Sequence, residues 1–504
     1  MKKHLSLFLS FLLLMSIQSF SQEKKKETVI PIGPAKKFES KHSININGQT
    51  INYQVLANET YLHNEKEEPI ASFWSVSYLK NEVKDYSQRP VMFIFNGGPG
   101  SASVWLHMGF FGPKVVQTDS EAKEDDGAAP FTIVDNAHSL LDLTDMVFVD
   151  PIGTGYSRVI GKGKEKDYWG LKEDANSVAE FMRKWITQHK RWQSPKYIAG
   201  ESFGTTRAAA VSEVLEGGGQ NMALNGLILI SQALDYAGST STHDNITSYV
   251  TYLPSMAATA WYHKKAGQGK SLEEFVEECR QFTYNTYTPA LYKGELLSDQ
   301  EKEAIADKLA YFTGLDKNYI KRSKLLILMG RFQKELLREE GMAIGRLDGR
   351  YFGDEDDDVA ERPTLGDASS YQISSAYTAA LNHYFAQNLK IEMKRPYLTS
   401  NGKLGSKWRW RTVPDGAYWE PSYVNTSRSL SKAMRRNPSM KVLVACGYYD
   451  LITPFFDAEF TFSRNGIPSD RVTLTYYEGG HMMYNHRPSF EQLAKDIREF
   501  IEDK

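Results

Sequence analysis

The sequence contains very little cysteine. Of its 504 residues, only Cys279 and Cys446 are cysteines. Cys446 falls in a predicted central strand and Cys279 in a predicted helix, so we expect two free, buried thiols rather than a bridge. A fold held together by a framework of disulfides is therefore excluded.

No excess of charge of either sign is present. The chain has 60 Lys and Arg against 62 Asp and Glu, a formal net charge of -2. Basic residues are scattered among acidic ones and form no stripe interleaved with aromatics, which argues against a nucleic-acid partner. The acidic run from Asp354 to Asp358 lacks the alternating ligands, central glycine and distal glutamate of a calcium loop. We expect no metal site and no cofactor.

One apolar run near the amino terminus has the length of a secretory signal rather than of a membrane span. Lys2 and Lys3 precede the run from Leu5 to Ile17, and small residues follow it before Gln22. This pattern predicts a cleaved signal peptide over 1–21 and a periplasmic or secreted mature chain without a stable membrane anchor. The alternative is an uncleaved anchor, for which the run is short. No cysteine lies near the cut, which excludes a bacterial lipoprotein anchor.

A Gly-x-Ser-x-Gly motif is the most informative feature. An apolar strand, Lys196 to Ala199, runs into Gly200-Glu201-Ser202-Phe203-Gly204 and then into a helix-like segment from Thr205 to Leu215. In this context the glycines let strand and helix approach closely, and the sharp turn exposes the Ser202 hydroxyl as in a nucleophile elbow. The motif alone also fits an ordinary turn, so Ser202 requires partners elsewhere in the sequence.

Two later strands end in suitable partners. The apolar run 441–450 ends at Asp450, and the run 472–481 ends at His481. The chain order Ser, Asp, His, with each residue past the carboxyl end of a strand, is typical of an α/β hydrolase. We expect His481 to accept the serine proton and Asp450 to orient the imidazole.

Other residues compete for these roles. Asp457 and Glu478 are alternative carboxylates, but Asp457 falls inside the following helix and Glu478 is very close in sequence to His481. His486 is an alternative base, although it lies in a polar turn typical of a solvated residue. The positions of Asp450 and His481 fit the chemistry better.

A glycine-rich loop supplies candidate oxyanion donors. The apolar strand from Val91 opens into Asn96-Gly97-Gly98-Pro99-Gly100, upstream of the elbow. Attack on an acyl carbon places negative charge on oxygen, which preorganised amides stabilise. We assign the amides of Gly98 and Phe203 to this role. A tight turn is the alternative, and a phosphate cradle is disfavoured because no Gly-Lys-Ser/Thr follows.

These motifs together resemble the serine carboxypeptidases, the family of cathepsin A and of the yeast and plant vacuolar carboxypeptidases. The resemblance implies release of single residues from the carboxyl termini of peptides or proteins by acyl-enzyme chemistry, often at acidic pH. The matching segments keep the family's order and span residues 96 to 488; they are Asn96 to Gly100, Asp150 to Ser157, Gly200 to Gly204, Asp450, Gly480-His481-Met482 and Pro488.

The resemblance also implies how the substrate is bound. In the family, the asparagine of the glycine-rich loop and the glutamate before the nucleophile bind the terminal carboxylate. These roles fall on Asn96 and Glu201, with Gly97 in the same loop. A carboxyl group donates a hydrogen bond to a carboxylate only while protonated, so Glu201 requires a raised pKa.

Two positions depart from the family's pattern. Ile94 replaces a tryptophan, and Phe110 replaces a second glutamate of the carboxylate clamp. A cation is an alternative ligand for the terminal carboxylate, and Arg207 is close in sequence, although its place in a helix also fits a core position or an ion pair. The loss of half the clamp keeps a serine esterase or acyltransferase open as an alternative. An inactive binding protein is a third alternative, against which the intact triad speaks.

The strand pattern predicts a mostly parallel, doubly wound α/β-hydrolase sheet with helices on both faces. We expect antiparallel lead strands at 43–58 and 72–79 and parallel strands at 91–95, 145–149, 196–199, 224–230, 441–445 and 472–476. The stretch before residue 441 is too long for a simple crossover and has helical periodicity, which predicts a lid. The predicted organisation is a signal peptide (1–21), a flexible lead-in (22–42), a first core part (43–240), a helical lid (241–395) and a second core part (396–504).

Overall fold

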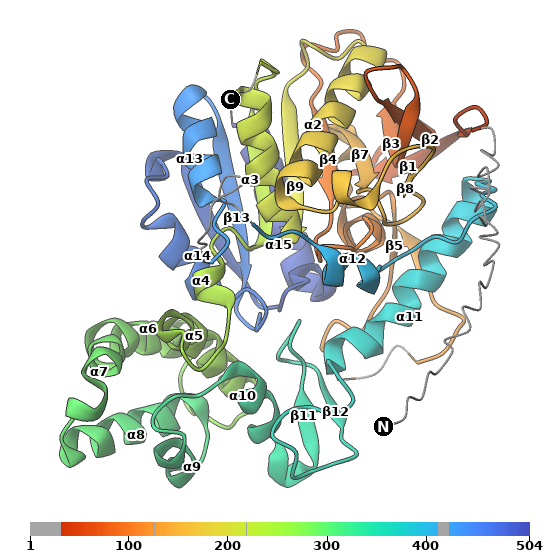
Figure 1. Cartoon of the computed structure of the whole chain (residues 1–504). Helices are drawn as coiled ribbons and strands as arrows, with labels where there is room; N and C mark the ends of the chain where they lie inside the picture. Colours follow the sequence, from red (N-terminus) through yellow and green to blue (C-terminus); the bar gives the residue numbers. More distant parts are fainter. Residues whose placement is uncertain (1–31, 124–126, 218, 412–422, 504) are drawn as a thin grey trace, which may run out of the picture. The chain divides into compact units, whose positions relative to one another are not determined.

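A mostly parallel β-sheet lies at the centre of the structure. The computed structural model describes residues 32–123, 127–217, 219–411 and 423–503, so the predicted signal peptide lies outside the described residues. The strand order is β1-β2-β3-β7-β4-β9-β10-β13-β14, with β8 paired to β3 (Figure 1). The strands of this sheet are β1 (Lys37–Ile46), β2 (Gln49–His63), β3 (Pro69–Lys80), β4 (Val91–Phe95), β7 (Asp145–Asp150), β8 (Arg158–Val159), β9 (Lys196–Ser202), β10 (Gly226–Gln232), β13 (Lys441–Gly447) and β14 (Val472–Tyr477).

The six strands from β7 to β14 in this order are parallel to one another, whereas β3 pairs with β7 antiparallel. They correspond to the six predicted core strands. Every residue of β4 and β10 is buried, as expected for parallel strands covered on both faces. This arrangement confirms the predicted α/β-hydrolase fold.

The lead strands differ from the prediction. One strand was expected over 43–58, but the structure has β1 and β2 joined by Asn47 and Gly48, whose φ angles are 50° and 77°. Asn-Gly at a two-residue turn is typical of a tight hairpin, so the signal was present in the sequence. β1 also begins at Lys37, inside the predicted flexible lead-in, because it pairs with β2 along its whole length.

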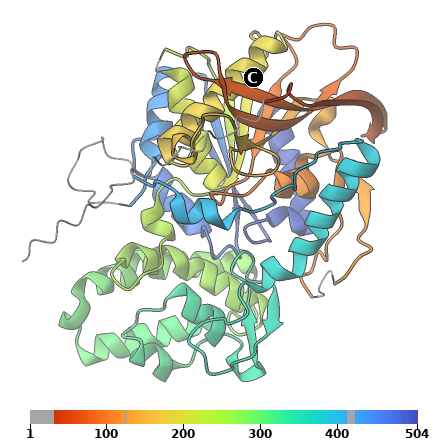
Figure 2. The same cartoon turned by 45° about the vertical axis from the view of Figure 1, so that its right-hand side comes forward.

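Helices cover both faces of the sheet. Alternate residues of β4 show this, because Met92 and Ile94 belong to one buried hydrophobic cluster and Phe93 and Phe95 to another. The first cluster includes residues of α15, and the second includes residues of α2, α3, α13 and α14; Figures 1 and 2 show α3 and α13 side by side. These helices are α2 (Leu171–Gln188), α3 (Phe203–Glu216), α13 (Ser427–Arg436), α14 (Phe455–Phe462) and α15 (Arg487–Glu502).

A long insertion separates β10 from β13 (Figure 2, green to cyan). Ser271 and Ser298 cap two of its helices, each with a capping box to the glutamate three positions on, which explains where both helices begin. Before α13 the insertion contains α4 (Tyr236–Ser239), α5 (Ile246–Tyr262), α6 (Leu272–Phe282), α7 (Thr288–Lys293), α8 (Asp299–Thr313), α9 (Lys317–Arg322), α10 (Met329–Glu335), the hairpin β11 (Met342–Ile344) and β12 (Phe352–Asp354), α11 (Ala368–His383) and α12 (Gly402–Lys407).

The insertion contributes to all three buried clusters, since Leu404 of α12 lies in the second one. Buried residues of α5 to α10 form a third hydrophobic cluster, whereas Ile373, Tyr377 and Leu381 of α11 belong to the first cluster beside the sheet. The lid boundaries at 241 and 395 stay a prediction. Within the described ranges, the helices include none with the length and apolarity needed to cross a bilayer.

The two cysteines are free and buried, as predicted. Cys446 lies in β13 and Cys279 in α6, so they occupy different cores. Burial raises the pKa of both thiols, which keeps them protonated.

Candidate active site

Ser202 lies at the junction of β9 and α3. Its φ of 60° and ψ of −130° are strained for a residue with a side chain. The neighbouring backbone leaves no room for a side chain at the flanking glycines: a Cβ on Gly200 would lie 2.4 Å from the Gly204 carbonyl oxygen, and one on Gly204 would lie 2.7 Å from that of Phe95. The motif therefore folds as a strained strand-to-helix turn, the geometry of a nucleophile elbow.

The parallel sheet brings Ser202, Asp450 and His481 to the same end of the sheet, where the carboxyl ends of its strands lie. Ser202 is paired with Gln232 at the carboxyl end of β10, and Asp450 and His481 follow β13 and β14, the next two strands. The hydroxyl of Ser231 in β10 donates to the His481 carbonyl oxygen at 2.7 Å, which ties the histidine loop to the strand beside the serine. Residues more than two hundred positions apart thus share one end of the sheet.

His481 is paired with Asp450. Its Nδ1 lies 2.8 Å from Asp450 Oδ2, and both side chains are buried. Asp450 Oδ1 also accepts hydrogen bonds from the amides of Ile452 and Thr453 at 2.7 and 2.9 Å, and Oδ2 accepts one from the Thr453 hydroxyl at 2.8 Å. Burial by itself lowers the pKa of His481, but the charge and hydrogen bond of Asp450 outweigh it, so the pKa is raised.

The competing residues occupy other environments. Asp457 lies in α14, where it accepts a hydrogen bond from Gln232 at 3.2 Å. The ring of His486 lies 2.8 Å from the Ser489 hydroxyl. Glu478 is exposed, although partial desolvation raises the pKa of its carboxyl group. Of the three predicted carboxylates, Asp450 is the one in contact with His481.

The glycine-rich loop abuts the elbow. A Cβ on Gly97 would lie 2.5 Å from the Phe203 nitrogen and 2.9 Å from the Ser202 Cβ, so a larger residue would displace the loop. Gly98 follows with a φ of 107°, a conformation that favours glycine. Phe203 opens α3, and the first amides of a helix point outward without intrahelical acceptors. The amides predicted as oxyanion donors therefore lie on two segments in contact.

Asp150, in the predicted motif 150–157, supports the same loop. Its Oδ1 accepts hydrogen bonds from the amide and hydroxyl of Ser103 at 2.9 and 2.8 Å and from the hydroxyl of Tyr397 at 3.0 Å. Ala102 and Asn401 form main-chain bonds across the same junction, to Thr399 and Gly100. The segment around 397–401 is thereby attached to the loop that precedes α1 (Val104–Leu106).

Glu201 is buried directly before Ser202 in the chain, with an exposed fraction of 4%. Asn96 Nδ2 donates to its Oε1 at 2.9 Å, and the Tyr484 hydroxyl donates to its Oε2 at 2.6 Å. Burial raises the pKa of Glu201 to about 7, against the opposing effects of His481 and the two hydrogen bonds. The structure thus brings Asn96 and Glu201 together and provides the raised pKa that the carboxylate clamp requires.

Arg207 is not available for a substrate carboxylate. Its Nε lies 2.6 Å from Asp174 Oδ2, its Nη1 donates to the Asn96 carbonyl oxygen at 2.8 Å, and its exposed fraction is 1%. The alternative in which Arg207 binds the terminal carboxylate is wrong, because a buried partner already neutralises its charge. Its role is to anchor the glycine-rich loop to α3.

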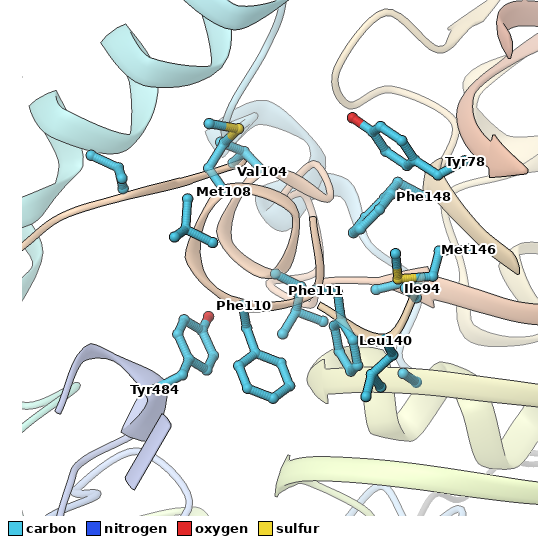
Figure 3. Close-up of a cluster of buried hydrophobic side chains, with 14 of the residues drawn as sticks. Tyr78, Ile94, Val104, Met108, Phe110, Phe111, Leu140, Met146, Phe148 and Tyr484 are labelled. Carbon is cyan, nitrogen blue, oxygen red and sulfur yellow. The ribbon is translucent and has the colours of Figure 1, made fainter. Parts of the chain in front are cut away.

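Phe110 and Ile94 are both core residues. Phe110 lies in the π-helix His107–Phe111, with its ring between those of Tyr484 and Phe490 at centroid distances of 5.8 and 5.0 Å. Figure 3 shows the rings of Phe110 and Tyr484 next to each other. Ile94 is fully buried in β4. An aromatic contact therefore occupies the place that the resemblance gives to the second clamp glutamate.

Tyr484 was missed by the sequence analysis. It lies in the short helix Met483–Asn485, just after His481, and its hydroxyl meets Glu201. A buried tyrosine needs a hydrogen-bond partner, so its position in an apolar run beside the histidine was the available signal. The identity of the partner depends on a contact across 283 residues.

Comparison with known proteins agrees with this geometry. A family model described as serine carboxypeptidase matches residues 53–473. The human retinoid-inducible serine carboxypeptidase is 27% identical over 238 residues, 46% of this chain and 48% of that protein. Serine carboxypeptidase-like 16 of Arabidopsis thaliana is 29% identical over 166 residues, 32% of this chain and 36% of that protein. These alignments span about half or less of the length of the curated relatives.

A solved structure shares the fold along most of its length. It is that of Kex1(Δ)p, a prohormone-processing carboxypeptidase from Saccharomyces cerevisiae, with a TM-score of 0.55 and 14% identity, covering 90% of this chain and 91% of that chain. At this identity the likeness concerns the fold. The family match covers most of the sequence, and the chain belongs to the serine carboxypeptidase family.

Proposed function

We propose that this protein is a serine-type carboxypeptidase that releases residues from the carboxyl termini of peptides and proteins. In this proposal Ser202 is the nucleophile, His481 the general base and Asp450 the residue that orients the imidazole. The amides of Gly98 and Phe203 form the oxyanion hole, and Asn96, Gly97 and Glu201 bind the departing residue.

The acylation step follows from this assignment. His481 accepts the hydroxyl proton as Ser202 attacks the last peptide carbonyl, while Asp450 holds Nδ1 and stabilises the imidazolium. The Gly98 and Phe203 amides stabilise the oxyanion. His481 then donates its proton to the departing amine, and an acyl-enzyme remains. Water, activated by the same imidazole, completes hydrolysis.

The observation that carries the exopeptidase assignment is the environment of Glu201. A buried carboxyl group with a pKa of about 7, directly before the nucleophile, is neutral under acidic conditions. A neutral carboxyl accommodates a second carboxyl group without the repulsion of two like charges. Discrimination in favour of a free carboxyl end is therefore expected at acidic pH.

A serine esterase or acyltransferase is the second candidate. The observation that favours it is the apolar packing of Phe110, which leaves Glu201 as the one carboxyl group of the clamp predicted from the resemblance. Ser202, His481 and the oxyanion loop serve ester and peptide chemistry equally. The distinction depends on whether a terminal carboxylate is recognised.

The amino-terminal run supports the proposal that the mature enzyme is periplasmic or secreted. Lys2 and Lys3 precede the apolar segment Leu5 to Ile17, and small residues follow it. Detection of a mature protein that begins near Gln22 outside the cytoplasm would test this proposal.

The decisive experiment is mass spectrometry of amino-blocked peptides with free or amidated carboxyl ends, incubated with the enzyme and with Ser202→Ala at pH 5 and pH 7. We expect stepwise loss of terminal residues from the free-acid peptides and none with Ser202→Ala. Hydrolysis of a simple ester without any peptide cleavage would instead support the esterase.

A further inference from the structure

The two oxygens of the Glu201 carboxyl group are not equivalent. Oε1 faces the Asn96 side-chain amide at 2.9 Å, and Oε2 faces the Tyr484 hydroxyl at 2.6 Å. An amide nitrogen only donates, whereas a hydroxyl both donates and accepts. The partners therefore decide which oxygen carries a proton when Glu201 is neutral.

The orientation of Asn96 is determined by its other contact. Its Oδ1 accepts a hydrogen bond from the Leu106 amide at 3.0 Å, so Nδ2 must face Glu201. Oε1 consequently accepts a hydrogen bond from Asn96 whether Glu201 is ionised or neutral. In that direction it has no room for a proton of its own. The proton of neutral Glu201 belongs on Oε2, where it points at the Tyr484 oxygen.

The hydroxyl of Tyr484 must then change its role. Beside ionised Glu201, Tyr484 donates its one hydrogen to Oε2. Beside neutral Glu201, it accepts the hydrogen of Oε2, and its own hydrogen is released to another acceptor. Phe110 packs against the ring of Tyr484, with centroids 5.8 Å apart and an interplanar angle of 29°, so the ring is held while the O–H rotates (Figure 3).

We propose that Tyr484 donates the hydrogen bond to the terminal carboxylate of the substrate, and that protonation of Glu201 releases the Tyr484 hydroxyl for this role. The inference rests on the proposed carboxypeptidase function and deepens it by naming the donor. Only hydrogen-bond directions change, and no covalent bond is formed or broken. Tyr484 thus provides a polar clamp contact in a chain that has Phe110 where the resemblance places a glutamate.

The surrounding groups are compatible with this exchange. His481 favours the charged form of Glu201, and Asp450 opposes it. Burial, then the charge of Glu201, then Tyr377 raise the pKa of Tyr484 well above its ordinary value, so the phenol stays protonated while Glu201 titrates. Tyr377 donates its own hydroxyl hydrogen to Asn485 at 2.6 Å.

The test compares benzyloxycarbonyl-Phe-Leu with a free carboxyl end and the same compound as the amide, by the ratio of their kcat/KM values from pH 5 to 8. A methyl ester of blocked phenylalanine reports on the catalytic machinery. For the wild type, we expect the ratio to fall as pH passes about 7, where Glu201 ionises.

Tyr484→Phe removes the donor and preserves the ring. We expect the ratio at pH 5 to fall about 10- to 100-fold, the effect of losing a hydrogen bond to a charged group, with ester hydrolysis retained. Tyr477→Phe is the matched control, because its hydroxyl also lies 2.6 Å from a carboxylate, that of Asp496, and should leave the ratio unchanged. Melting temperatures of both variants report on folding.

Glu201→Gln gives the sharper result. Its amide oxygen would accept from Asn96 and its amide nitrogen would donate to Tyr484 at every pH, which imitates neutral Glu201. We expect the ratio of kcat/KM for the free acid to kcat/KM for the amide to stay at its acidic value up to pH 8. A ratio that still falls above pH 7, or an unchanged ratio in Tyr484→Phe, would overturn this inference and leave the carboxypeptidase intact. A wild type that hydrolyses the ester but prefers no free acid would overturn both.

Discussion

Two buried carboxyl groups of the candidate site, those of Asp450 and Glu201, have different surroundings. Asp450 accepts hydrogen bonds from two main-chain amides, one hydroxyl and the His481 ring. Glu201 accepts them from two neutral side chains, Asn96 and Tyr484. The first set of donors suits an ionised group that pairs with an imidazolium. The second set, in a buried position, allows a proton to be held near neutral pH.

The difference shows how one site can hold two acids in different roles. Desolvation opposes ionisation of a buried carboxyl group, and the number and charge of its donors decide how far this is offset. Asp450 lies in a tight turn that aims main-chain amides at it, whereas Glu201 lies at the end of a strand whose amides belong to the sheet. The local backbone thus fits the proposed roles, in which Asp450 orients the imidazole and Glu201 belongs to the carboxylate clamp.

The largest predicted effect concerns Asp450 and its role in orienting His481. Asp450→Asn keeps the shape of the side chain but favours the wrong tautomer of His481, and we expect kcat to fall about 10⁴-fold. Because imidazole orientation is needed for every acyl substrate, the loss should be equal for the blocked ester and the free-acid peptide. Steady-state kinetics on both substrates measure it. A loss confined to free-acid peptides would show that Asp450 acts in substrate binding.

A smaller effect tests the Glu201 side through stability. The pKa of Glu201 is about 7 in the folded chain and close to 4.3 in an unfolded one. As pH rises, the unfolded chain therefore loses its proton first and becomes relatively more favourable. We expect wild type to lose about 3 kcal/mol of unfolding free energy relative to Glu201→Gln between pH 4 and pH 8.

Urea denaturation of the two proteins at pH 4, 6 and 8 measures this difference. The Glu201→Gln variant is the control for all other titrating groups, since they are common to both chains. If the difference in unfolding free energy between wild type and Glu201→Gln stays constant over this pH range, Glu201 has an ordinary pKa in the folded protein. The contrast with Asp450 would then be lost.

The smallest predicted effect concerns a single hydrogen-bond donor to Asp450. Thr453→Val removes one of several donors to Asp450 and also the hydroxyl that lies 3.3 Å from His481 Nδ1. Since the two main-chain amides remain, we expect kcat to fall only about 5-fold, close to 1 kcal/mol. Thr461→Val is the matched control, because its hydroxyl faces Asp457 instead. A 100-fold loss would show that the amides contribute little.

Much of the fold could be predicted because its signals are local. The six parallel strands appear as short apolar runs, and Ser271 and Ser298 mark two helix starts through capping boxes. The hairpin at Asn47 and Gly48 was also local, and the long alternating segment around it obscured the turn. Where one insertion contributes to several cores, no local pattern indicates which helix belongs to which core.

The site divides in the same way. The elbow at Ser202, the glycine-rich loop and the chain order of Ser202, Asp450 and His481 could be predicted from the sequence, because each motif depends on a few adjacent residues. The ion pair of Arg207 with Asp174 and the hydrogen bond of Tyr484 to Glu201 could not, because both form only when distant elements pack together. Contacts between residues so far apart in the sequence depend on how whole helices and strands pack. The local sequence around a side chain therefore does not indicate which distant residue it will contact.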